Sequence, residues 1–219
     1  MCFSATASFT AAGITGAIGL ATLSRVRRPR NLAMAAMPLV FAVQQGVEGL
    51  IWLNLMAAPD PAGLSRLSFW FLMFAQVIWP AFAPLAVWLI EPDARRRRAM
   101  AAILALGVAL SLYFFWGLMT RPHSAAIEGE HVVYQIRQDH LLLVGAAYLT
   151  TTGLSLAIST LRPVALTGAI IMLGCAVAYT AYWVAIISVW CFFAAIASLT
   201  LLWHFERIRR RGLLAAAPI

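Results

Sequence analysis

Seven long apolar segments follow one another along this chain, and the connections between them carry most of its charged residues. Each segment is close in length to the run of about 20 residues that an α-helix needs to cross a bilayer. Hydrophobic residues make up 63% of the sequence, more than soluble globular domains contain. The sequence therefore predicts an all-α polytopic membrane protein with a single seven-helix domain. The predicted spans cover residues 4–23, 33–56, 67–90, 99–118, 139–160, 163–184 and 185–205, with an external loop at 119–138.

All sixteen basic residues are arginine, and their distribution predicts the orientation of the chain. The connections after the first, third and fifth predicted helices, together with the C-terminal tail, carry thirteen of them. Because arginine is concentrated on the cytoplasmic side of membrane proteins, we expect the N-terminus outside and the C-terminus in the cytoplasm. The net charge of +8 then follows from topology and from contact with anionic membrane lipids. We expect a multi-pass protein of the bacterial inner (cytoplasmic) membrane, without nucleic acid as a partner.

Glu48 is the only acidic residue well inside an apolar segment. Gln44, Glu48 and Trp52 are spaced four residues apart, so they share one face of the second predicted helix. A carboxylate that faces lipid is costly, so such a residue normally faces the interior of a bundle and indicates a functional site. The alternative interpretation is a protonated Glu48 that holds two helices together by hydrogen bonds.

Polar residues on other predicted helices lie at a depth similar to that of Glu48. They indicate a polar cavity that opens toward the outer leaflet and is lined by the second, third, fifth and seventh predicted helices. His140, Val144 and Tyr148 form one stripe on the fifth of these helices. The predicted binding residues are Gln44, Gln45, Trp52, Gln76, Trp79, Tyr148 and Trp190.

Two functional hypotheses follow from this layer of polar residues. In the first, Cys2, Glu48, His140 and Cys191 bind a metal such as zinc, whose usual ligands are thiolate, imidazole and carboxylate. The metal would activate water for hydrolysis of a lipid or small amphiphile, with Glu48 and His140 as the catalytic residues. In the second, Glu48 and His140 form a titratable pair in the cavity of a ligand-binding or sensor protein. Neither HExxH nor CxxC occurs in the sequence, and a cysteine in a spanning helix is most often a small apolar filler.

The connections and the fourth predicted helix add further expectations. The alternating run His131–Ile136 in the long external loop favours a small hairpin. Asp139 is well placed to cap the fifth predicted helix. Pro80 and Pro84 should kink the third predicted helix and free backbone carbonyls. The fourth predicted helix is the least polar and faces lipid or a protein partner, which fits a homo-oligomer or an accessory subunit of a larger membrane complex.

Four short motifs are spread over the whole chain: Met1–Ala5, Gln44–Trp52, the pair Trp79–Pro80, and Trp190–Ala195. Together they resemble those of an uncharacterised prokaryotic family of small multi-pass membrane proteins that open on Met-Cys-Phe-Ser. The resemblance implies a seven-helix fold and a domain of unknown function, and it implies no activity. The motif residues coincide with the predicted polar layer, which supports a site there but no particular reaction.

Overall fold

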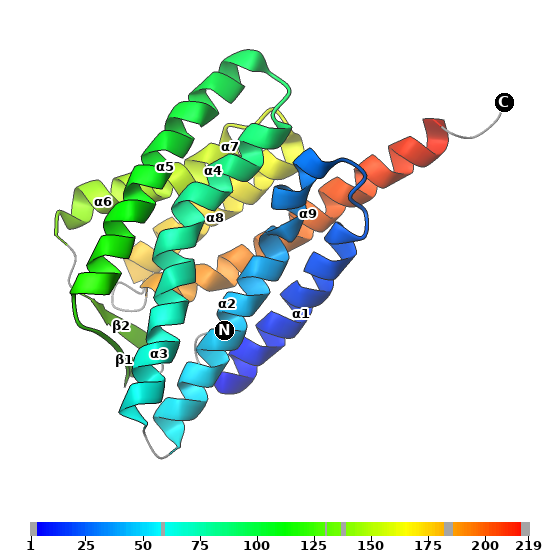
Figure 1. The fold of residues 1–219 in the computed structure, drawn as a ribbon. Coiled ribbons are helices and arrows are strands. Elements are labelled where there is room, and N and C mark those ends of the chain that lie inside the picture. Colours follow the sequence, from blue (N-terminus) through cyan, green and yellow to red (C-terminus); the bar gives the residue numbers. More distant parts are fainter. Residues whose placement is uncertain (1–3, 58–59, 130, 137–138, 182–185, 216–219) are drawn as a thin grey trace.

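The computed structural model describes residues 4–57, 60–129, 131–136, 139–181 and 186–215, without the side chains of 181, 186–192 and 211–215. Within these residues the helices form seven rods, of which the third and the fifth are each built from three consecutive elements (Figure 1). The simple rods are α1 (Ala5–Leu23), α2 (Leu32–Met56), α5 (Ala94–Thr120), α8 (Arg162–Ala181) and α9 (Ile186–Ala215). The composite rods are α3–η2–α4 (Pro61–Leu72, Met73–Ile78, Trp79–Ile90) and α6–η3–α7 (Leu141–Leu149, Thr150–Leu154, Ser155–Ala157).

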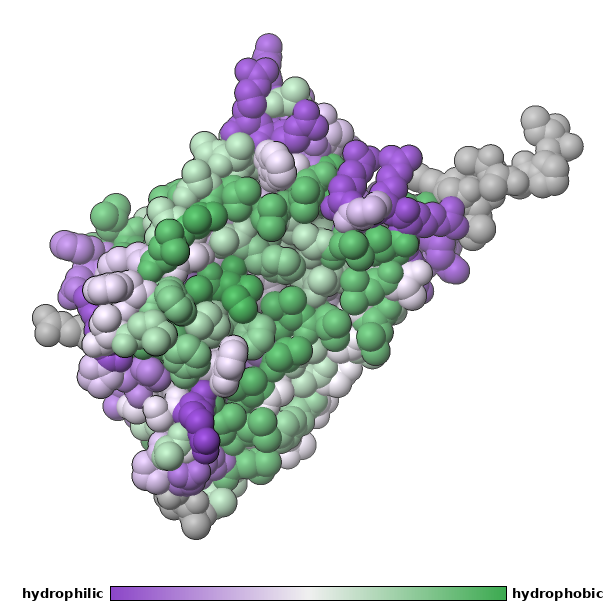
Figure 2. All heavy atoms as spheres, viewed as in Figure 1, coloured by the Kyte–Doolittle hydropathy of each residue, from purple (hydrophilic) through white to green (hydrophobic). Residues whose placement is uncertain are grey.

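Five of the rods are long and apolar enough to cross a membrane, over residues 5–23, 29–56, 61–90, 94–120 and 162–180. The fifth rod, Leu141–Ala157, is apolar but shorter. On the face shown in Figure 2, apolar residues cover the middle of the bundle and hydrophilic residues gather toward its ends. The structure therefore confirms a helical bundle with several helices of membrane-crossing character, whereas the number of spans and their orientation stay predictions.

Helix capping explains where two rods begin before the predicted bounds. The Asp60 carboxylate accepts a hydrogen bond from the Ala62 backbone N–H, and Pro61 occupies the first turn, where a missing N–H costs nothing. Asp93 caps α5 in the same way, by accepting from the Arg96 N–H at 2.8 Å. The arginine run 95–98 therefore lies within a helix and not in a connection.

The long external loop contains the expected hairpin, so the described chain is not entirely helical. Strands β1 (His123–Glu128) and β2 (His131–Ile136) pair antiparallel, and Gly129 takes the positive φ that their tight connection requires. The Tyr134 ring stacks on Phe71 of α3, with centroids 4.2 Å apart. The hairpin thus covers the end of the bundle at which α2 meets α3, which we call the hairpin end (Figure 1).

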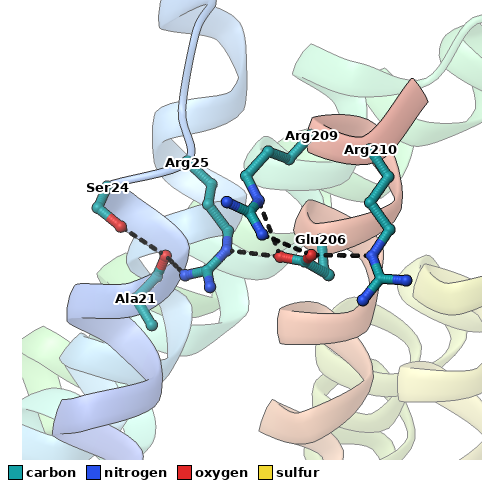
Figure 3. A network of polar contacts seen from close by, with 6 residues as sticks. All are labelled: Ala21, Ser24, Arg25, Glu206, Arg209 and Arg210. Carbon is teal, nitrogen blue, oxygen red and sulfur yellow. Dashed lines mark hydrogen bonds and ion pairs between the residues drawn. The ribbon is translucent and has the colours of Figure 1, made fainter. Parts of the chain in front are cut away.

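The opposite end, where α1 meets α2 and α4 meets α5, is the arginine-rich end. Here Glu206 of α9 accepts from Arg25, which follows α1, at 3.0 Å, and also pairs with Arg209 and Arg210 on its own helix (Figure 3). These hydrogen bonds lower the pKa of Glu206 to about 2. The network ties the end of the first rod to the last one.

A buried carboxylate makes a second link at the arginine-rich end. Glu91, just after α4, accepts hydrogen bonds from the hydroxyl of Ser159 (2.8 Å) and from the hydroxyl and backbone N–H of Thr160. Burial raises the pKa of this carboxyl, but the hydrogen bonds from Thr160, Ser159 and Asp93 lower it by more, so that it lies below the ordinary 4.5. Glu91 thereby holds the end of the third rod against the connection between the fifth and sixth rods.

Close approach between backbones shapes the contact between α1 and α2, which we call the α1–α2 seam. A Cβ atom placed on Gly19 would lie 2.7 Å from the Leu39 backbone nitrogen, and one on Gly49 would lie 2.7 Å from the Phe9 ring. Small residues let membrane helices pack this closely, because van der Waals contact replaces the missing hydrophobic driving force. The seam is therefore a tightly packed wall on one side of α2.

Candidate functional site

A cavity of about 310 Å³ lies on the other side of α2, inside the bundle. Its volume is at the lower end of the range of about 300–1,000 Å³ that is typical of small-molecule sites. Six of the seven rods contribute to its walls, all except α1. The lining residues are Met37, Phe41, Gln44, Ala75, Gln76, Trp79, Ala83, Phe114, Leu141, Val144, Gly145, Tyr148, Leu149, Thr152, Leu156, Thr167, Ile171, Cys175, Ala194, Ala197, Ser198 and Leu201.

Two π-helical segments face the cavity, η2 in the third rod and η3 in the fifth. Ala75 and Gln76 of η2 and Thr152 of η3 belong to its lining. Such segments widen a helix locally, occur mostly as single turns and are frequent at functional sites. The backbone thus departs from regular α-helical geometry on two sides of the cavity.

The backbone of η2 explains one polar contact in the cavity wall. The Trp79 N–H bonds to the Phe74 carbonyl, and Pro80 has no N–H to offer, so the Ala75 carbonyl lacks its usual partner within the helix. The Tyr148 hydroxyl, from the fifth rod, donates to this carbonyl. Tyr148 therefore satisfies a buried acceptor that the π-helical turn and the proline expose.

A second polar contact joins α2 to the third rod across the cavity wall. The Trp79 indole Nε1–H donates to Gln44 Oε1 at 2.7 Å. The Trp79 ring also lies 6.5 Å, centroid to centroid, from the ring of Phe41. These contacts place Gln44, Trp79 and Tyr148, all predicted from the sequence, at one site.

The cavity is mainly apolar, in contrast to the polar cavity that the sequence predicted. Among the described residues that line it, none carries a formal charge. On α2 the lining residues Met37 and Phe41 lie in the half nearer the arginine-rich end and Gln44 lies at the middle, whereas Glu48 and Trp52 lie in the other half. The cavity is therefore not confined to the depth of Glu48.

The predicted site residues fall into three groups. Gln44, Gln76, Trp79 and Tyr148 line the cavity, whereas Gln45, Glu48 and Trp52 are buried in α2 but are not part of its lining. His140 is exposed and takes a left-handed conformation (φ 55°) just before α6. Cys2 and the side chains of Trp190 and Cys191 lie outside the described residues, so their predicted roles stay predictions.

Asp139, expected to cap the fifth predicted helix, pairs with Arg121 instead. Its carboxylate oxygen lies 2.5 Å from the Arg121 guanidinium, and His140 occupies the N-cap position of α6. The pair connects the start of α6 to the residue that follows α5. An electrostatic link between two connections thus takes the place of the expected local cap.

Other buried polar groups on and near α2 lie outside the cavity lining. The Gln45 side chain is fully buried, and neither its amide nitrogen nor its amide oxygen has a hydrogen-bond partner in the described part of the chain. The same holds for the indole nitrogen of Trp52 and for the hydroxyls of Ser8 and Ser68. Glu48 is also fully buried. The predicted interior position of Glu48 therefore agrees with its burial.

The metal hypothesis rests largely on residues whose placement is not described. Within the described residues, no three side chains of His, Cys, Asp or Glu come together as a metal site would require. Glu48 is fully buried, whereas His140 is exposed at the start of α6. A zinc site built from Cys2, Glu48, His140 and Cys191 thus stays a prediction.

The sequence did not predict that α5 and α8, the fourth and sixth rods, contribute to the cavity wall. Phe114 of α5 and Thr167, Ile171 and Cys175 of α8 all line the cavity. Cys175 is half-buried there as a free thiol. Apolar residues in an apolar helix give no local signal that separates a cavity wall from a lipid-facing surface.

Comparison with known proteins places the chain in a family. The model of DUF6629, a family of unknown function, matches residues 1–217. No curated protein and no solved structure matches the chain. The match agrees with the resemblance to a domain of unknown function that the four sequence motifs indicated. The chain belongs to the DUF6629 family.

Proposed function

We propose that this protein is an integral membrane protein that binds a small, largely apolar molecule in the cavity between its helices, without chemistry. The observation that carries the proposal is the cavity of about 310 Å³, walled by six rods and lined by uncharged residues. Pre-formed, mainly apolar cavities with a few polar groups are the usual form of small-molecule sites. A ligand-binding or sensor role fits this geometry better than hydrolysis.

The position of α6 supports uptake of the ligand from the membrane. Leu141 and Gly145 both line the cavity and are exposed on the surface, Leu141 by 52%. Their neighbours Leu142 and Leu143 are exposed by 81% and 72%. Exposing these leucines to water would cost free energy, whereas contact with lipid hydrocarbon would not. The cavity thus reaches the surface where the bilayer would cover it, and an apolar molecule can enter sideways.

The arrangement of the connections supports an orientation with the N-terminus outside. The arginines of 25–30 and 95–98 and those of the α9 tail lie at the same end of the bundle, as Figures 1 and 2 show. A reporter fused to the C-terminus should then behave as cytoplasmic. A periplasmic signal from that fusion would contradict the orientation but would leave the cavity proposal intact.

Two glycines allow a matched test of ligand binding. Gly145 lines the cavity and Gly117 does not, and a Cβ atom on either would meet no other atom within 4 Å. Gly145→Phe should fill the mouth of the cavity, whereas Gly117→Phe adds the same side chain elsewhere. Each protein would be extracted directly into polymer-bounded nanodiscs, and its organic extract compared by mass spectrometry with that of protein-free nanodiscs.

We expect a small molecule at close to one copy per chain in the natural protein and in Gly117→Phe, and a strongly reduced amount in Gly145→Phe. Equal unfolding temperatures of the two variants would show that both fold. Identical extracts from all three proteins, with no species enriched over the lipid background, would contradict the proposed function.

A further inference from the structure

The polar groups in the cavity wall decide which ligand the cavity can recognise. Most of their donors are already used within the protein: Tyr148 donates to the Ala75 carbonyl and the Trp79 indole to Gln44. The hydroxyls of Thr152, Thr167 and Ser198 donate to backbone carbonyls of their own helices, one turn earlier. The wall therefore has few donors left for a ligand.

Gln76 differs from these residues. It lines the cavity, its side chain is 5% exposed, and its Oε1 has no hydrogen-bond partner in the described part of the chain. A buried acceptor without a partner destabilises the folded state, so native structures rarely keep one without a reason. The terminal torsion of a glutamine is broad, so rotation of the side-chain amide can direct this oxygen toward the cavity without moving η2.

The charge of the cavity restricts the ligand further. A charged group is costly in an apolar site unless an opposite charge pairs with it, and the described lining offers none. A carboxylate, phosphate or ammonium group on the ligand would thus be rejected. A hydroxyl group can donate to Gln76 Oε1 and adds no charge.

We propose that the ligand is a neutral amphiphile with an apolar body and one hydroxyl group, which donates a hydrogen bond to Gln76 Oε1. This inference rests on the proposed function, because it names the chemical class that the same cavity binds. The apolar lining from Phe41, Phe114 and Leu156 surrounds the body of the ligand, and Gln76 in η2 fixes its polar end.

The test compares three brominated probes of equal chain length in lipid nanodiscs: 12-bromododecan-1-ol, 1-bromododecane and 12-bromododecanoate. Bromine quenches tryptophan fluorescence on contact, and Trp79 lines the cavity. The difference in quenching between the natural protein and Trp79→Phe separates the cavity signal from that of exposed tryptophans such as Trp70 and Trp116, which contact probe dissolved in the lipid. Binding is expressed as the mole fraction of probe in the lipid at half-maximal quenching.

We expect the alcohol to bind about tenfold more tightly than the alkane, the ratio that one net hydrogen bond of about 1.4 kcal/mol supplies. The carboxylate should bind more weakly than either. In Gln76→Leu the alcohol and the alkane should bind about equally tightly, because the hydrogen bond to the alcohol is lost while the apolar contacts remain. Because leucine removes a buried acceptor without a partner, this variant should unfold at the same temperature as the natural protein or higher.

The possible failures are distinguishable. Equal binding of alcohol and alkane, a preference that survives in Gln76→Leu, or tighter binding of the carboxylate would each overturn the inference and leave the cavity as an unselective apolar site. Absence of quenching through Trp79 by all three probes would overturn the proposed function itself.

Discussion

The two sides of α2 are held together by different forces. On the α1 side, glycines bring helix backbones into direct contact, as Gly19 does against Leu39. On the cavity side, the third and fifth rods each contain a π-helical turn, and polar contacts such as Trp79–Gln44 and Glu91–Ser159 hold them. Along the seam the helices pack closely at their glycines, whereas on the other side the two irregular turns line a cavity. We therefore expect the α1–α2 seam to act as the scaffold and the cavity side to carry the proposed binding function.

The largest effect should come from filling the α1–α2 seam. Gly19→Leu forces a side chain against the backbone of Leu39, which cannot move away, and should cost about 3 kcal/mol or more, at the upper end of overpacking. Gly13→Leu is the matched control, because a Cβ atom there meets nothing within 4 Å. Thermal unfolding in detergent measures both. Equal unfolding temperatures would show that the seam is not the scaffold.

Removing the buried carboxylate at the rim of the cavity side should have the next largest effect. Glu91→Gln replaces a charged acceptor of several hydrogen bonds by an amide and should cost about 2 kcal/mol. Glu128→Gln, on the exposed hairpin strand, is the control and should leave the unfolding temperature unchanged. If Glu91→Gln left the unfolding temperature unchanged, the link between the third rod and the connection to α8 would not contribute to stability.

The lowered pKa of Glu91 also predicts how this link responds to pH. A carboxyl whose pKa is lower in the folded state adds stability above its ordinary pKa of 4.5 and loses it as the pH falls below that value toward the folded-state pKa. The difference in unfolding temperature between the natural protein and Glu91→Gln should therefore be constant from pH 8 to about 5 and shrink below it. If this difference in unfolding temperature grew as the pH fell, the pKa of Glu91 would not be lowered in the folded protein.

A smaller effect should follow from removing the hydroxyl that satisfies the Ala75 carbonyl. Tyr148→Phe leaves this buried acceptor without its partner and should cost about 1 kcal/mol. Tyr113→Phe, whose hydroxyl donates over a longer 3.3 Å to the Asp139 carbonyl, provides the comparison. Hydrogen exchange in η2 should rise in Tyr148→Phe alone. Unchanged exchange there would show that the tyrosine does not stabilise the π-helical turn.

The smallest effect should come from the ion-pair network of Figure 3. Arg25→Gln removes one of three arginines that contact Glu206, and the other two lie on the same helix as the carboxylate. Surface ion pairs contribute little because water and salt screen them, so the unfolding temperature should stay within experimental error. Because the pKa of Glu206 is about 2, the network should remain intact at pH 4. A marked loss of stability in Arg25→Gln would place part of the scaffold at this contact.

Several features followed from local patterns in the sequence. Long apolar segments between charged connections predicted the helices, and the alternation in His131–Ile136 predicted the hairpin strand. Four of the polar residues chosen from helical spacing, Gln44, Gln76, Trp79 and Tyr148, do line one cavity. Polar residues in apolar helices stand out against a uniform background, which explains why this much of the site was predictable.

By itself, the sequence determined the class of fold, because backbone hydrogen bonding and hydropathy are local properties that each segment satisfies alone. The tertiary structure decided that Gln44 faces the cavity while its neighbour Gln45 and the buried Glu48 lie outside its lining. It also decided that α5 and α8 help to wall the cavity, and that η2 and η3 depart from α-helical geometry. These features depend on how six rods pack against one another. Contacts between residues far apart in the chain produce no periodic pattern in the sequence of any single rod.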